Sequence, residues 1–302
     1  MDDVDAPVRM AAFNYLAEQT LVHGDALPRS ILERGFVYDG RPTPLVGPQG
    51  IFKPAVMRDM PLSITTAPVV EGRPRPYEDQ ISDEGLISYR YRGEDPMHHE
   101  NIGLRRAMET QAPLIYFYGL VPGRYAATWP AYIVADDPST LTFTVAVDEP
   151  HALSGTASTG LAEDLRRRYA TRVQLHRLHQ ASFRQRVIRA YRETCAVCRL
   201  RHRELLDAAH IVADISRGQP TVRNGLALCK LHHAAFDQNI VGIRPDLVVE
   251  ISLSVLSEID GPMLIHGLQG FHGATLTVPH SASLRPDRGF LEERYELFRQ
   301  AG

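Results

Sequence analysis

The sequence predicts an α+β protein in two parts that differ in their chemistry. The first observation is a mixture of short β-rich runs with one helical segment between residues 77 and 147, which is typical of a curved sheet or partial barrel. The second is that all three cysteines fall between residues 195 and 229, at spacings that suit one zinc ion. The third is an Arg-rich helical stretch that follows a small polar linker and separates the two parts.

Composition excludes several classes of protein. The chain has 302 residues, which is enough to bury a full core without disulfide bonds. Hydrophobic residues make up 44% and charged residues 23%, as in an ordinary soluble globular protein. No apolar run is long enough to cross a bilayer, so we expect no membrane association. The acidic N-terminus has no apolar core, and three cysteines make no disulfide framework, so a reducing cytoplasm is expected.

Residues 1–36 are expected to form N-terminal helices. Pro7 suits a first helical turn, and a second short helix should run from Asp25 to Gly35. Helical spacing relates the apolar residues of the first helix, which are Met10, Phe13, Leu16 and Ala17. Pro and Gly are then frequent from residue 37 to residue 76, which predicts strands, turns and loops there.

Residues 37–150 are predicted to form the curved sheet. A helix is expected over residues 101–111, because Leu104, Ala107 and Met108 share one helical face. Strands are expected over residues 85–91, 113–119, 129–134 and 141–147.

Residues 151–181 are assigned to the linker and to an Arg-rich helix. Between Leu161 and Arg203 the chain has twelve Arg against three acidic residues, although the net charge of the whole chain is −3. Such a run is either a solvated helix face or a surface that binds nucleic-acid phosphates. The near-absence of Lys has two readings as well: selection of Arg for bidentate phosphate contacts, or a GC-rich genome.

The cysteines predict a structural zinc site. Cys195 and Cys198 form a Cys-x-x-Cys pair, and Cys229 and His232 form a Cys-x-x-His pair about thirty residues later. Three thiolates and one imidazole make a tetrahedral set that zinc accepts, and such a closed set leaves no position for a substrate. The alternative is a redox-active Cys-x-x-Cys pair.

The residues around these knuckles resemble the HNH nuclease family. The matching pattern reads Cys195-x-x-Cys198, Ala-His210-Ile and Asn224-Gly-Leu-x-Leu-Cys229-x-x-His232-His233-x-x-Phe236-Asp237, preceded by Phe183-Arg-x-x-Val-x-x-Ala-Tyr191. The resemblance implies a ββα-metal finger within residues 182–302. It also implies that His210 is the general base, that Asn224 orients the base or the finger, and that His233 binds a catalytic divalent ion.

These roles suit phosphodiester hydrolysis. A near-neutral imidazole can accept a proton from water, and one Mg²⁺ or Mn²⁺ can stabilise charge on the leaving oxygen. Many family members carry a second metal ligand immediately before the base, where this chain has Ala209. Asp237 lies four residues after His233 on the expected helix and is the candidate second ligand. Asp207 is the alternative, and Asp237 would then be only a hydrogen-bond acceptor.

The N-terminal part resembles the SRA (YDG) family, in which a curved SRA/PUA-like sheet flips a modified cytosine out of duplex DNA. The likeness covers about residues 37–150 and rests on Tyr77-Glu-Asp79, Gly85, Tyr89-Arg-Tyr91-Arg-Gly93 and Asn101-x-x-Leu104. The family's Gly-Ser-Gly-Gly run is absent. The resemblance implies that Tyr77, Asp79 and Tyr91 line a base pocket, with Gln80 as the alternative reader of the base edge.

The residue types themselves, apart from any family resemblance, also suit a pocket for a flipped base. A flipped base needs aromatic faces for stacking and a carboxylate or amide for its Watson–Crick edge. Tyr77, Asp79, Tyr89 and Tyr91 offer these groups within fifteen residues. Alternatively, the tyrosines are strand residues that pack a core.

The sequence therefore predicts a modification-dependent, type IV-like restriction endonuclease that acts on double-stranded DNA. A homodimer is one arrangement that would let such an enzyme cut both strands. One alternative is an HNH restriction or nicking enzyme acting on unmodified DNA. An alternative of another class is a non-catalytic zinc protein that binds DNA. In the C-terminal stretch we expect strands over residues 247–253 and 274–278 and a helix over residues 290–298.

Overall fold

The computed structural model describes residues 4–68, 86–148, 161–213 and 220–301. The chain divides into two compact units, Met1–Ala181 and Ser182–Gly302. Both helices and antiparallel strands occur in each unit, so the predicted α+β class is confirmed. Among the described helices, none combines the length and the apolar character that crossing a bilayer requires.

The N-terminal unit begins with two helices. Helix α1 spans Ala6–His23 and α2 spans Arg29–Arg34, and Gly35 ends α2 with a φ of 61° that favours glycine. Phe13 and Leu16 of α1 are buried as expected, but Met10 is 45% exposed. Ala17 is exposed as well, so the prediction that Met10 and Ala17 share the buried face is wrong. Arg9 takes a buried position instead, because its guanidinium donates to the carbonyls of Pro61 and Pro113 at 2.8 and 3.0 Å.

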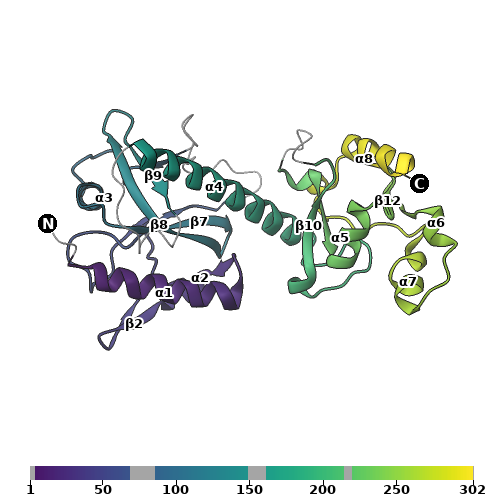
Figure 1. Ribbon diagram of the computed structural model, residues 1–302, viewed down its shortest axis with the longest axis horizontal. Coiled ribbons are helices and arrows are strands. Elements are labelled where there is room, and N and C mark those ends of the chain that lie inside the picture. The colour runs from purple at the N-terminus through teal and green to yellow at the C-terminus, as the bar shows by residue number, and fades with distance from the viewer. Residues whose placement is uncertain (1–3, 69–85, 149–160, 214–219, 302) are drawn as a thin grey trace. The chain divides into compact units, whose positions relative to one another are not determined.

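A seven-stranded sheet follows, with strand order β4-β5-β7-β8-β9-β6 and β1 paired to β8. Only the pairing of β5 with β7 is parallel within this sheet. The strands are β1 Leu27–Pro28, β4 Ile51–Phe52, β5 Ser63–Thr66, β6 Ile87–Arg90, β7 Leu114–Val121, β8 Arg124–Asp137 and β9 Thr142–Val147. A separate small hairpin joins β2 Phe36–Tyr38 to β3 Arg41–Thr43. Helix α3 spans His99–Glu109 and lies beside the sheet (Figure 1). Its Leu104 and Ala107 side chains are buried in the core of the sheet.

The sheet curls into a half-barrel. Strand β6 is at one end of the strand order and β5 is close to the other, yet the Tyr89 hydroxyl of β6 donates to the Thr65 carbonyl of β5 at 3.4 Å. Irregularities in register interrupt the β7–β8 and β8–β9 pairings. Such bulges bend and twist a sheet, which lets its two edges approach each other. This curvature agrees with the curved sheet expected from the sequence.

One long helix, α4, spans Leu161–Ala190. Leu175 and Leu178 belong to the core of the N-terminal unit, whereas Phe183 and Val187 belong to the core of the C-terminal unit. Most of the Arg-rich stretch therefore forms one helix, and the apolar residues of this helix belong to the cores of both units.

The C-terminal unit is built around a hairpin and a helix. Strand β10 (Leu206–His210) pairs antiparallel with β11 (Gly225–Cys229), and helix α5 (Lys230–Asp237) follows directly. The short 3₁₀ helices η2 (Arg203–Leu205) and η4 (Val222–Asn224) precede the two strands. The remaining elements are β12 Val241–Ile243, β13 Val249–Ile251, α6 Leu253–Leu256, α7 Pro262–Gly267, η5 Gln269–Phe271, η6 Ala282–Leu284 and α8 Arg288–Ala301.

The strand expected over residues 274–278 is wrong. This segment makes one isolated bridge, between Thr275 and Val248. The Leu276 amide donates to Leu247, but the next amide, of Thr277, donates to Ala196. Because consecutive residues bond to two different segments, no ladder forms. The expected strand at 247–253 and helix at 290–298 correspond to β13 and α8.

Candidate active site and metal centre

Three cysteines and a histidine converge on one point in the C-terminal unit. Cys195 and Cys198 lie in the turn after α4, Cys229 ends β11, and His232 lies in the first turn of α5. Their ligand atoms all lie within 4.8 Å of one another. None of the three cysteines is in a disulfide. The hairpin and helix therefore bring together the residues that the two sequence knuckles supply.

The distances fit a tetrahedral ion. The Cys198 and Cys229 sulfurs are 3.9 Å apart, close to the edge of about 3.8 Å that a tetrahedron with Zn–S bonds of about 2.3 Å would have. The His232 Nδ1 atom is 3.1 Å from the Cys229 sulfur and 3.7 Å from the Cys195 sulfur. The cluster could thus hold zinc without rearrangement of its backbone.

Hydrogen bonds with neighbouring backbone groups orient the ligand atoms of these side chains. The His232 Nε2 lies 2.9 Å from the Gly267 carbonyl, and an N–H there leaves Nδ1 free of a proton and turned to the sulfurs. The Cys229 amide lies 3.3 Å from the Cys195 sulfur and can donate to it. The adjacent Cys195 and Cys229 sulfurs raise the pKa of the Cys198 thiol. A cation among the three sulfurs would therefore favour the thiolate form of Cys198.

His210 lies at the end of β10, opposite Gly225 in the hairpin register. Its imidazole stacks on the Phe183 ring of α4, with the ring centroids 3.9 Å apart and the planes inclined by 9°. A Cβ atom on Gly225 would come within 2.4 Å of Val187 and 2.9 Å of Phe183. Glycine at this position therefore allows α4 to approach the hairpin and fix the orientation of His210.

Asn224 is fully buried and forms hydrogen bonds with the backbone that follows His210. Its Oδ1 accepts from the Val212 amide and its Nδ2 donates to the Val212 carbonyl, both at 2.9 Å. The Asn224 carbonyl also accepts from the Ile211 amide at 3.0 Å. These bonds hold the backbone of the two residues that follow His210.

His233 of α5 stands between the two candidate carboxylates. Its Nδ1 is 3.7 Å from Asp207 of β10, and its Nε2 is 3.4 Å from Asp237 at the end of α5. The hydrogen bond with Asp207 raises the pKa of His233 above its usual value. Burial opposes ionisation of Asp207, but the His233 bond, the Ala208 amide and Arg184 lower its pKa to about 2. Asp207 is therefore a carboxylate at neutral pH.

Arg184 is a site residue that the sequence analysis did not single out. Its guanidinium donates to the Asp207 carboxylate at 2.9 Å and to the Leu206 carbonyl at 2.6 Å. It follows Phe183 directly, so two consecutive residues of α4 support His210 and Asp207. The signal was present in the Phe183-Arg184 pair before the first knuckle, but nothing in the sequence tied the arginine to Asp207.

A family profile described as an HNH endonuclease matches residues 195–244. The match begins at the first cysteine of the cluster and includes the hairpin, α5 and β12. The chain carries an HNH endonuclease domain. The protein is accordingly a DNA endonuclease, and nucleases with this domain use divalent metal ions.

Two solved structures are similar to the chain at low identity. The first, described as "Modification dependent TagI restriction endonuclease", is 16% identical, covers 78% of this chain and 81% of its own, and gives a TM-score of 0.29. The second, described as "Structure of the Type IV phosphorothioation-dependent restriction endonuclease ScoMcrA", is 12% identical over 79% of this chain, with a TM-score of 0.21. The aligned part spans 56% of that second protein. The search of curated proteins found no match.

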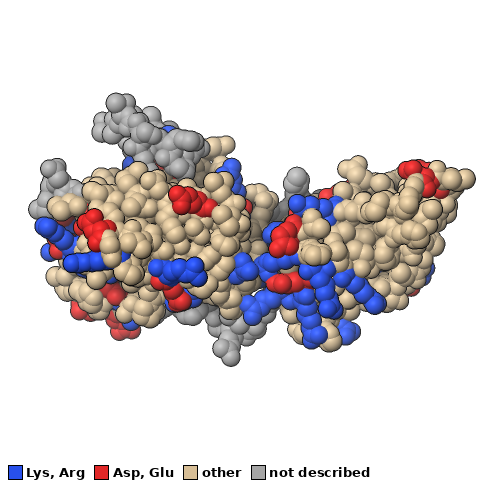
Figure 2. Space-filling model, turned by 90° about the horizontal axis from the view of Figure 1, so that it is seen from below, with Lys and Arg blue, Asp and Glu red and all other residues tan. Residues whose placement is uncertain are grey.

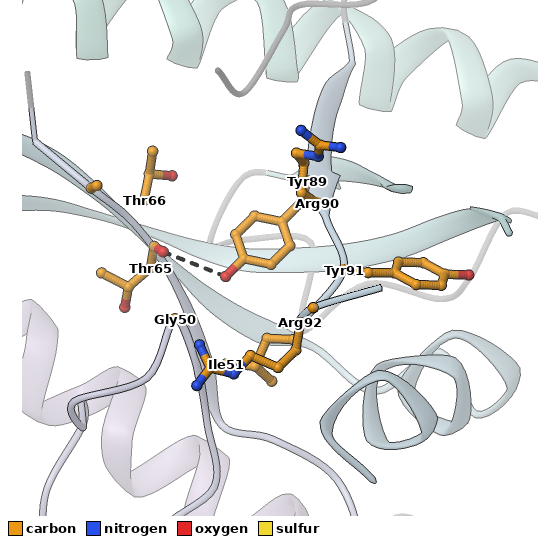
Figure 3. A pocket seen from close by; sticks show the side chains of 10 residues that line it. Gly50, Ile51, Thr65, Thr66, Tyr89, Arg90, Tyr91 and Arg92 are labelled. Carbon is orange, nitrogen blue, oxygen red and sulfur yellow. Dashed lines mark hydrogen bonds between the residues drawn. The ribbon is translucent and has the colours of Figure 1, made fainter. Parts of the chain in front are cut away.

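The predicted base pocket is described only in part. Tyr77, Asp79 and the alternative Gln80 lie outside the described residues. Tyr89 and Tyr91 line a cavity of about 260 Å³ where β6 approaches β5, together with residues of β4, β5 and the turn after β6 (Figure 3). The other lining residues are Gly50, Ile51, Thr65, Thr66, Ala67, Arg90, Arg92 and Gly93.

The two tyrosines differ in how they face this cavity. The Tyr89 ring extends towards Thr65, whereas the Tyr91 ring points away from Thr65 and Gly50 (Figure 3). Tyr91 stacks on Phe143 at 4.5 Å, and its hydroxyl is bonded to Asp136 and Arg105. A Cβ atom on Gly50 would lie 2.9 Å from the Tyr89 hydroxyl. Tyr89 is thus the aromatic wall of the cavity, while Tyr91 mainly packs the core.

Proposed function

We propose that the protein is a modification-dependent restriction endonuclease. In this proposal the N-terminal half-barrel takes up a modified cytosine, 5-methyl or 5-hydroxymethyl, from duplex DNA, and the HNH domain hydrolyses the phosphodiester. The observation that carries the proposal is the pairing of an HNH domain with a sheet that closes a Tyr89-walled cavity. A flipped base needs such a cavity with an aromatic wall and polar edges. Thr65, Thr66 and Arg92 supply polar groups around it.

The hydrolytic step is assigned to the side chains of the hairpin and α5. His210 accepts a proton from a water molecule, whose oxygen attacks the phosphorus while the bond to the leaving oxygen breaks. Asn224 holds the backbone beyond His210. His233 would hold Mg²⁺ or Mn²⁺ with Asp207 or Asp237, and the ion would stabilise negative charge on the leaving oxygen. Zinc at the Cys195, Cys198, Cys229 and His232 cluster would maintain the fold.

A basic surface supports DNA binding by the HNH domain. Lys and Arg side chains gather on the face of the C-terminal unit seen in Figure 2, with few acidic side chains among them. Exposed basic residues of this unit include Arg189, Arg192, Arg199, Arg201 and Lys230. Neutralising phosphates with such residues releases counterions and gives sequence-independent affinity. We therefore assign sequence or modification choice to the N-terminal unit.

Cleavage of a plasmid panel tests the proposal. Plasmids with cytosine, 5-methylcytosine or 5-hydroxymethylcytosine are incubated with the protein and Mg²⁺ or Mn²⁺, and nicked and linear products are separated on gels. We expect cleavage of modified plasmid only. Equal cleavage of all plasmids would leave an HNH enzyme for unmodified DNA, and no cleavage at any protein excess would favour a zinc DNA-binding protein. We also propose that two copies pair to cut both strands, and linear product without a nicked intermediate would support this pairing.

A substitution in the Tyr89 cavity tests whether this cavity reads the modification. Gly50→Val should fill the Tyr89 cavity, because even a Cβ atom at Gly50 reaches 2.9 Å from the Tyr89 hydroxyl. The preference for modified plasmid should then fall by at least tenfold. Gly261→Val is the matched control, because a Cβ atom there meets nothing within 4 Å. Unchanged preference in Gly50→Val would move the reading site elsewhere.

The second ligand of the catalytic ion can be identified by substitution. Since Asp207 is ionised, buried more than Asp237 and fixed by Arg184, we expect Asp207→Asn to weaken Mn²⁺ binding about tenfold or more. Asp237→Asn should have a smaller effect, because Asp237 is 57% exposed. Mn²⁺ titration followed by calorimetry and by cleavage rate measures both variants. A larger loss in Asp237→Asn would assign the ligand to α5.

A further inference from the structure

A second cavity in the N-terminal unit has no role in the proposed function. It has a volume of about 500 Å³ and is lined by residues of α4, of β8, of the end of β9 and by Thr20 of α1. Its lining combines two aromatic side chains, Trp129 and Tyr169, with a hydroxyl, an amide, a carboxylate and a guanidinium, which belong to Thr128, Gln174, Asp148 and Arg177. These polar and aromatic side chains distinguish the cavity from a packing defect, which is lined by apolar side chains.

The polar side of the cavity is fixed by its own contacts. Gln174 Nε2 donates to the Thr128 hydroxyl at 3.1 Å, and Thr128 is only 4% exposed. The Asp148 side chain is 3% exposed and accepts from Arg166 at 2.7 Å. These groups are therefore held in place before any ligand arrives. Polar groups held in fixed positions give a pocket specificity for particular ligands.

The aromatic side chains are placed for stacking. Trp129 is half-buried and packs partly on the core formed with α1, while it also lines the cavity. Tyr169 is 72% exposed on α4 at the edge of the same cavity. An exposed tyrosine next to a tryptophan leaves apolar ring surface in water, and a planar aromatic ligand would cover it.

The charges favour an anionic ligand. Arg177 is exposed at the cavity, and Arg166 is 51% exposed beside Asp148. Tyr169, Val173 and Arg177 are spaced by four residues along α4, so the guanidinium and the phenol lie on one helix face. Guanidinium groups favour phosphate through paired hydrogen bonds.

We propose that this cavity binds a nucleotide, with the base against Trp129 and Tyr169 and the phosphate at Arg177. The Gln174 amide would bond to the edge of the base. The nucleotide is either one unit of a DNA strand or a free mononucleotide, and both present the same ring and phosphate. The site is separate from the Tyr89 cavity, so the inference does not rest on which modification the protein reads.

The protein contains its own probe for this site. Trp129 is the one tryptophan in the sequence, so intrinsic tryptophan fluorescence reports on this cavity. The full-length protein is titrated with deoxycytidine monophosphate, deoxyguanosine monophosphate, inorganic phosphate or a twelve-base-pair duplex. We expect saturable quenching by the mononucleotides, the duplex or both, and none by inorganic phosphate. Quenching by the duplex alone assigns the site to a DNA strand, and quenching by mononucleotides alone assigns it to a free nucleotide.

Variants of exposed residues decide whether quenching arises in the cavity. Tyr169→Ala and Arg177→Ala should each weaken the affinity about tenfold. Arg168→Ala is the control, because Arg168 is an exposed arginine of the same helix that does not line the cavity. The inference is overturned if no nucleotide or duplex quenches the fluorescence, or if both cavity variants bind as well as Arg168→Ala does. Since the readout is binding, it is independent of any cleavage result.

Discussion

Replacement of His210 with alanine is expected to reduce DNA cleavage by about 10²–10⁴-fold, the usual contribution of a general base. The imidazole is the proposed proton acceptor for the attacking water, and an alanine side chain cannot replace it. Affinity for DNA should remain, because binding depends on the exposed arginines of the HNH domain rather than on this ring. The loss should therefore fall on the cleavage rate at saturating protein.

Single-turnover cleavage and a DNA-binding assay on the same preparation measure these two effects. His202→Ala is the matched control, since His202 is an exposed histidine four residues before β10. Zinc content should be unchanged in both variants, because neither His210 nor His202 is one of the clustered ligands. Cleavage by His210→Ala at the normal rate would show that another group activates the water. Loss of DNA binding together with cleavage would instead indicate a structural role for the Phe183 stack.

The local chemistry of the HNH domain was predictable because it depends on short spacings. Cys195 and Cys198 are three residues apart, as are Cys229 and His232, so each pair must reach one ion wherever the hairpin lies. His233 and Asp237 are four residues apart, so a helix brings their side chains to the same face. In contrast, the contact of Arg184 with Asp207 joins α4 to β10 across 23 positions. Hydrophobic periodicity indicates that such a helix is buried, but not which carboxylate it meets.

The half-barrel was predictable as a class and less so in its details. The alternation of apolar and polar residues over 85–91 predicted strand β6. The same alternation does not show whether a tyrosine in this strand lines a pocket or packs in the core. The structure separates Tyr89 from Tyr91 through long-range contacts, with Thr65 for the first and with Phe143, Asp136 and Arg105 for the second. The cavity beside Trp129 was missed for a similar reason. Its lining comes from α1, β8, β9 and α4, which no local pattern connects.

Removal of zinc is expected to unfold the HNH domain while the N-terminal unit stays folded. Cys195 and Cys229 are buried in the core of the C-terminal unit, together with Leu206, Leu228 and Phe236. Zinc binding in small metal-stabilised folds contributes about 10–16 kcal/mol, which is as large as the whole stability of an ordinary domain. The two cores of the N-terminal unit include none of the four clustered side chains. A chelator or Cys229→Ala should therefore remove one of two unfolding transitions and all cleavage.

Calorimetry, zinc analysis and limited proteolysis distinguish this result from a general loss of stability. His266→Ala is the matched control, because His266 is an exposed histidine near the cluster that is not one of its ligands. After chelation, proteolysis should leave the N-terminal unit intact and digest the segment beyond Ser182. Added zinc should restore the second transition, whereas added Mg²⁺ should not, because a site of three thiolates and one imidazole favours the softer ion. A chelated protein that keeps both transitions but loses cleavage would place the zinc requirement in the reaction rather than in the fold.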